Sequence, residues 1–168
     1  MYLLRPIRFF AKALTSELAP RQLAVGFALG MVIGLVPKGN LTTIVLVAIL
    51  CAIRVNLGVG LLSAFVFSWA GILTDPLTHH IGLFLLTHDS LRPLWSYLYD
   101  LPVAPWTDFN NTIVLGSLVL GLALAYPAYR FSLPLFGRYT PMMSAKLQRF
   151  KVLRFLWSAE WAGKLGKA

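Results

Sequence analysis

The sequence is poor in charged residues, and acidic residues are scarcest of all. Asp and Glu together number 6, against 15 Lys and Arg, and charged residues make up 12% of the 168 positions. A soluble chain is typically about 25% charged. Cysteine is almost absent too: Cys51 stands alone in an apolar run, so no internal disulfide can form. These shortages exclude a disulfide framework and leave too few carboxylates for a paired-acid catalytic site.

Apolar residues, in contrast, are unusually abundant. They account for 58% of the chain, and the mean hydropathy is +0.72. A water-soluble fold of this size cannot hide so much apolar surface, and a disordered chain would not stay solvated. The composition therefore predicts an all-α, multi-pass membrane protein with short, broken or re-entrant transmembrane helices.

The net charge of +9 is unevenly distributed along the chain. Basic residues precede the first apolar run and follow the last one, whereas the middle segment 88–111 carries three aspartates and one arginine. Because Lys and Arg collect on the cytoplasmic side of membranes, we expect both termini to be cytoplasmic. The chain has no recognisable nucleic-acid module, so the expected partner is the lipid bilayer and not nucleic acid.

Three regions follow from this pattern. Residues 1–19 read as a basic amphipathic interfacial segment, residues 20–129 as the membrane domain, and residues 130–168 as a basic cytoplasmic tail. The membrane domain contains apolar segments near 22–36, 41–53, 57–73, 77–86 and 112–129. The first two reach only about 20 Å each, short of the roughly 30 Å hydrocarbon core. They either cross a thinned bilayer or form a re-entrant hairpin.

Two polar interruptions supply a candidate polar site, made of Lys38, Asn40, Asp75 and Thr78. An ionisable carboxyl near a helix break in a membrane segment is a functional hypothesis by default. Lys38 could pair with Asp75 and join the two breaks. The alternative is structural: Asp75 caps the following helix, and Lys38 belongs to a solvated turn.

Other motifs indicate packing more than chemistry. Gly26, Gly30 and Gly34 recur at every fourth position and would form one smooth helix face for close packing. The scattered histidines 79, 80 and 88, even with Asp89, fall short of a metal site. We therefore expect no catalytic residue, no metal and no cofactor.

The sequence also resembles a bacterial membrane family catalogued only as domain of unknown function twenty sixty-two. The resemblance is carried by the glycine-spaced run 25–37 and three short elements: Pro37-Lys38-Gly39-Asn40, Arg54-Val55-Asn56 and Asp75-Pro76-Leu77-Thr78. Asp75 stands where the family more often has Asn. The resemblance implies a bacterial inner-membrane location and brings no known reaction.

Two functions from different classes remain open. The first is an inner-membrane protein, not an enzyme, that handles a small solute or lipid at the polar site between the two helix breaks. The alternative is a non-catalytic scaffold or assembly protein that docks a membrane partner, or a second copy, through its glycine-rich faces. A membrane enzyme acting on lipid-linked substrates has the least support.

Overall fold

The computed structural model describes residues 19–149, with side chains as far as Tyr139. Within that part, every regular element is helical and no strand occurs, which confirms the all-α prediction. The helices are α2 (Pro20–Leu35), α3 (Leu41–Ala52), α4 (Leu57–Thr87), α5 (Arg92–Asp100) and α6 (Thr112–Arg149), with short 3-10 turns η2 (Asp89–Leu91) and η3 (Ala104–Thr107). The interfacial segment predicted for 1–19 lies outside the described residues, except for residue 19. So does the tail from residue 150.

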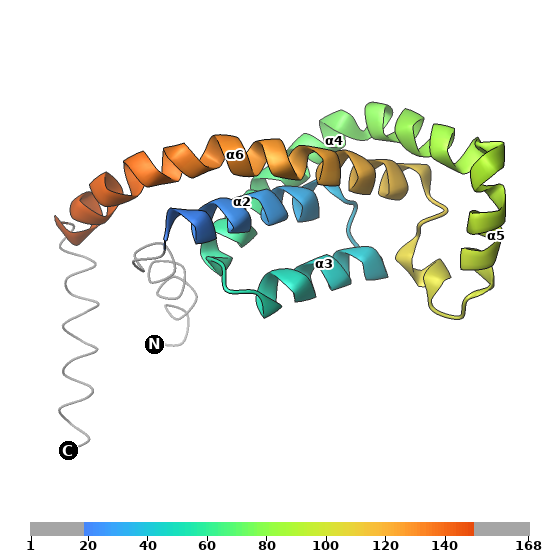
Figure 1. The fold of residues 1–168 in the computed structure, drawn as a ribbon, viewed down its shortest axis with the longest axis horizontal. Helices are drawn as coiled ribbons and strands as arrows, with labels where there is room; N and C mark the ends of the chain where they lie inside the picture. The colour runs from blue at the N-terminus through green and yellow to red at the C-terminus, as the bar shows by residue number, and fades with distance from the viewer. Residues whose placement is uncertain (1–18, 150–168) are drawn as a thin grey trace, which may run out of the picture.

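Helix α2 is the centre of the fold (Figure 1), and α4 and α6 pack against it. It is apolar on all sides, as expected of a helix surrounded by other helices. Its buried side chains include Met31, Val32 and Leu35, which pack with Leu118 and Ala125 of α6. α2 is therefore a short helix that is buried by the other helices of the protein.

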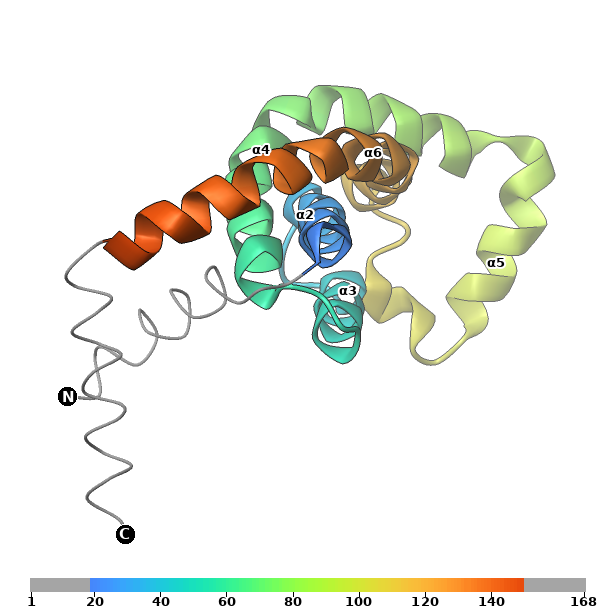
Figure 2. The same ribbon diagram turned by 60° about the vertical axis from the view of Figure 1, so that its left-hand side comes forward.

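Helix α4 corrects one prediction. The sequence indicates separate segments near 57–73 and 77–86, but the structure has one helix of 31 residues with Pro76 inside it. Proline removes one backbone hydrogen bond and crowds the carbonyl four residues before it, which kinks a helix without always ending it. Packing holds both halves: Gly71 lies against Leu35, and Gly116 of α6 lies against Thr78. Figure 2 shows α4 changing direction partway along its length.

Helix α6 contains the apolar segment predicted near 112–129 and continues past it to Arg149. Two helical stretches of the described chain, Leu57–Thr87 and Thr112–Tyr139, are long and apolar enough to cross a membrane.

The outer faces of α3, α4 and α6 carry many exposed large apolar side chains. Leu73 is 83% exposed, Phe131 75% and Trp69 66%. Others on the same helices are Ile44, Val45, Ile49, Leu62, Phe65, Val66, Ile72, Leu77, Phe84 and Leu122. A soluble monomer rarely exposes an apolar patch larger than a few hundred Å². The fold thus has a small buried core and a largely apolar exterior.

Candidate functional site

The glycine face of α2 lies directly against α4. A Cβ on Gly30 would overlap the backbone oxygen of Gly60 and lie 2.8 Å from Ser63 Cβ, and a Cβ on Gly34 would lie 2.6 Å from Phe67 Cβ. A Cβ on Gly26 would lie 2.9 Å from the backbone oxygen of Asn56. The glycine face of α2 therefore packs against α4 of the same chain.

Sequence reasoning missed two residues of these helix contacts. Gly82 lies so close to α6 that an added Cβ would overlap the backbone oxygen of Thr112. Asn56 is buried and begins α4, where its Oδ1 accepts a hydrogen bond from Val59 N at 3.0 Å. Signals for both are present: Thr78 and Gly82 have the spacing of small residues at helix contacts, and Asn before an apolar run is typical of a helix start.

Lys38 closes the end of α2. Its ammonium group donates hydrogen bonds to the backbone oxygens of Ile33 at 2.6 Å, Gly34 at 3.0 Å and Val36 at 2.6 Å. These carbonyls lie at a helix C-terminus, where they lack helical partners and attract a cation. An ammonium has three protons, and three carbonyls take them. Lys38 lies in the connection outside the helices, and its partial burial lowers its pKa below the ordinary lysine value.

Asn40 begins α3 and holds the same connection. Its Oδ1 accepts from Thr43 N at 2.9 Å, and its Nδ2 donates to Pro37 O at 3.0 Å. Gly39 has φ +99°, a conformation that glycine adopts without strain. Thr42 Oγ1 donates to Thr107 O at 2.8 Å and ties α3 to η3. The polar groups of this interruption are thus used to build the turn.

Asp75 and Thr78 lie one turn apart inside α4. Thr78 is buried, and its hydroxyl donates to the backbone oxygen of Asp75 at 3.1 Å. Asp75 is half-buried and mid-helix, so the expectation that it caps a following helix is wrong, because α4 does not end before it. Among residues 19–139, no ion pair or hydrogen bond joins Lys38 to Asp75. The two interruptions are therefore not linked by the predicted pair.

The histidines of α4 are engaged separately. His79 Nδ1 lies 2.7 Å from Thr112 Oγ1, and His80 Nδ1 lies 2.6 Å from Pro76 O. In the described part of the chain, no group of three or more His, Cys, Asp or Glu side chains is placed to hold a metal ion.

Charge divides the molecule into two ends. The basic end, defined by Arg21, Arg54 and Arg138, lies where α2 and α4 begin: Asn56 N donates to Gln22 O at 3.4 Å and brings the α3–α4 connection to the start of α2. The acidic end, defined by residues 88–111, contains Asp89, Asp100 and Asp108 with Arg92. In Figure 1 the two ends lie at opposite sides of the bundle.

An apolar cavity of about 400 Å³ lies at the basic end, between α2, α4 and α6. We call it the basic-end groove. Its lining is apolar except for a serine and a tyrosine hydroxyl: Leu23, Phe27, Val59, Leu62, Ser63, Val66, Phe67, Leu135, Phe136 and Tyr139. The Ser63 hydroxyl donates a hydrogen bond to the backbone oxygen of Phe27 at 2.7 Å. Leu62, Val66 and Leu135 are each 54% exposed, so the groove opens onto the apolar exterior.

Comparison with known proteins identifies relatives but no activity. Residues 5–142 match the family model described as "Uncharacterized protein conserved in bacteria (DUF2062)", a stretch that covers α2 to α5 and most of α6. An uncharacterized protein of Treponema pallidum (strain Nichols) is 29% identical over 127 residues, which cover 76% of this chain and 78% of that relative. No solved structure matches the chain.

Proposed function

The chain belongs to the uncharacterised bacterial family DUF2062, and we propose that it is a multi-pass inner-membrane protein that binds an anionic phospholipid in the basic-end groove. The proposed role is lipid handling without catalysis. The observation that carries it is an apolar groove that opens onto the apolar exterior and whose lining residues include near sequence neighbours of Arg21 and Arg138.

The apolar exterior supports membrane insertion. Exposed side chains such as Phe65, Trp69 and Leu73 would lie in hydrocarbon, where they cost nothing, instead of in water. Fully exposing one such side chain to water costs about 1.5–3 kcal/mol. The helix lengths also support membrane insertion, because α4 and the 112–139 part of α6 are long and apolar enough to cross a bilayer.

The two charged ends support one orientation. Arginines at the basic end favour the cytoplasmic side, and the aspartate-rich acidic end favours the external side. In this orientation the start of α2 and the far part of α6 both face the cytoplasm. The basic-end groove then opens at the depth of the inner leaflet.

The groove suits an acyl chain with an anionic headgroup. Its volume of about 400 Å³ is within the range of known ligand pockets, roughly 300–1,000 Å³. Arg21 lies two residues from Leu23, and Arg138 adjoins Tyr139, so both arginines flank lining residues. Among residues 19–139 no acidic residue lies at this end. A basic residue near a headgroup contributes about 1 kcal/mol to anionic lipid binding.

The test is lipid retention by the full chain in maltoside micelles supplied with phosphatidylglycerol or phosphatidylcholine and analysed by native mass spectrometry. We expect the wild-type protein to retain phosphatidylglycerol preferentially. Leu62→Trp fills the groove and should lower retention at least tenfold. Leu61→Trp is its matched control: Leu61 is the neighbouring residue, 38% exposed, and does not line the groove.

A charge series separates headgroup from acyl-chain recognition. Arg21→Gln with Arg138→Gln should reduce the preference for phosphatidylglycerol by about fivefold per arginine. Arg92→Gln at the acidic end should leave it unchanged. Equal retention by Leu62→Trp and Leu61→Trp would show that lipid does not occupy the groove.

A further inference from the structure

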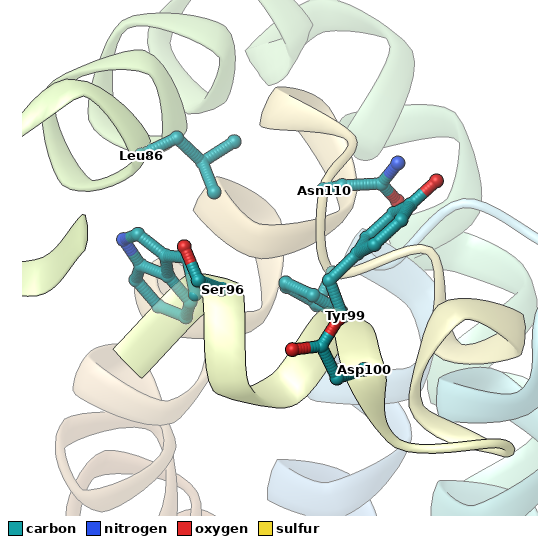
Figure 3. A pocket seen from close by; sticks show the side chains of 7 residues that line it. Leu86, Ser96, Tyr99, Asp100 and Asn110 are labelled. Carbon is teal, nitrogen blue, oxygen red and sulfur yellow. The ribbon is translucent and has the colours of Figure 1, made fainter. Parts of the chain in front are cut away.

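A second cavity lies at the acidic end. Unlike the basic-end groove, it is lined by an aspartate and other polar side chains together with aromatic rings. It measures about 370 Å³ and lies between the end of α4, α5 and the segment before α6. We call it the aromatic pocket; its lining residues are Leu86, Trp95, Ser96, Tyr99, Asp100, Phe109 and Asn110 (Figure 3).

Two contacts of Trp95 build this pocket. Its Nε1 donates to Leu85 O at 2.9 Å, which fixes α5 against the end of α4. Its ring stacks on Phe109, with centroids 6.0 Å apart and planes at 23°, which holds the segment before α6. Because Trp95 is tied on both sides, the pocket wall is fixed before any ligand arrives.

The polar side chains of the aromatic pocket are not used by the fold. Within residues 19–139, no hydrogen bond or ion pair engages the side chains of Ser96, Tyr99, Asp100 or Asn110. The polar side chains of the connection at 37–43 and the buried hydroxyls of Ser63 and Thr78 are, in contrast, all hydrogen-bonded inside the protein. Solvent-exposed polar side chains without a protein partner and aromatic rings therefore lie together at this cavity. Figure 3 shows Tyr99, Asp100 and Asn110 around the same opening.

The charge of the pocket is negative. Asp100 ends α5, where the helix carbonyls add partial negative charge, and Asp108 lies on the neighbouring segment. The basic side chain nearest to Asp100 in sequence, Arg92, forms an exposed ion pair with Asp89 at 3.9 Å. Aromatic faces attract cations, and a carboxylate beside them adds direct charge attraction. We propose that the aromatic pocket binds a compact organic ammonium group.

This proposal rests on the membrane placement above only for the source of the ligand. At the external surface, the ammonium belongs either to the ethanolamine headgroup of a lipid or to a free amine of similar size. Both sources present the same kind of ammonium group to the pocket, and the experiment distinguishes the lipid headgroup from the free amine.

The test uses the full chain in maltoside micelles, labelled with 5-fluorotryptophan, with the Trp95 ¹⁹F resonance assigned by its loss in Trp95→Phe. Tetramethylammonium and phosphoethanolamine should shift this resonance saturably, and sodium at equal ionic strength should not. Asp100→Asn should weaken binding at least tenfold. Asp89→Asn is the matched control, since Asp89 is also exposed but does not line the pocket.

Nanodiscs identify the source. If phosphatidylethanolamine discs already shift the Trp95 resonance relative to phosphatidylglycerol discs, and added amine has no further effect, the ligand is the lipid headgroup. If only the added amine shifts it, the ligand is free. No saturable shift, or equal binding by Asp100→Asn and wild type, would overturn the proposal. Asp100→Asn should still retain phosphatidylglycerol in the basic-end groove. Failure of the ammonium proposal can therefore be distinguished from failure of the lipid-binding proposal.

Discussion

Replacing Gly30 by alanine should separate α2 from α4. The added Cβ would overlap the backbone oxygen of Gly60 and lie 2.8 Å from Ser63 Cβ. Neither neighbour is the free end of a flexible side chain, so one helix must move by roughly 1 Å. Such a gap forfeits about a quarter to a half of the dispersion energy of the affected contacts.

The magnitude follows from two opposing effects. Overpacking a well-packed interface costs about 1–3 kcal/mol. Alanine inside a helix gains about 0.5–1 kcal/mol over glycine. We therefore expect Gly30→Ala to lower the free energy of unfolding by about 1–2 kcal/mol.

Gly137 supplies a control of the same chemistry. It also lies within a helix and is exposed, and a Cβ there would have no heavy atom within 4 Å. Gly137→Ala should therefore raise stability by about 0.5–1 kcal/mol. Unfolding in mixed micelles with increasing dodecyl sulfate, followed by circular dichroism, compares the two. Equal shifts in the same direction would refute the assignment of Gly30 to a close helix contact.

Two further sets of variants test the polar residues and the orientation. Lys38→Met removes the donor from three carbonyls at the end of α2 and should cost about 1–3 kcal/mol in the same unfolding assay, with faster amide exchange in the last turn of α2. Asp75→Asn should stay within about 0.5 kcal/mol of wild type, because no described residue bonds to that carboxylate; a larger loss would point to a partner of Asp75. In a Cys51→Ala background, an impermeant thiol reagent should label Ser90→Cys on intact spheroplasts and Arg54→Cys, in the exposed connection at the basic end, only in inverted vesicles; the reverse pattern would contradict the proposed orientation.

The sequence determined the fold class and the family, because both depend on composition and local patterns. A chain with 58% apolar residues, few charges and long apolar runs favours helices, because a helix bonds its own backbone groups and can therefore enter a membrane. Local chemistry also indicated a turn at Lys38, and linked short elements identified the family, whose match spans residues 5–142. These features need only near neighbours along the chain.

Only the tertiary structure decided how the interruptions behave and which polar groups remain available. Pro76 looks like a helix break in sequence, but packing against α2 and α6 on either side of it keeps α4 continuous. The sequence suggests that Lys38 pairs with Asp75, but in the structure the Lys38 ammonium donates its hydrogen bonds to backbone carbonyls at the end of α2. The basic-end groove and the aromatic pocket each join residues from distant segments. No local pattern encodes such cavities, because their walls exist only once the helices have packed.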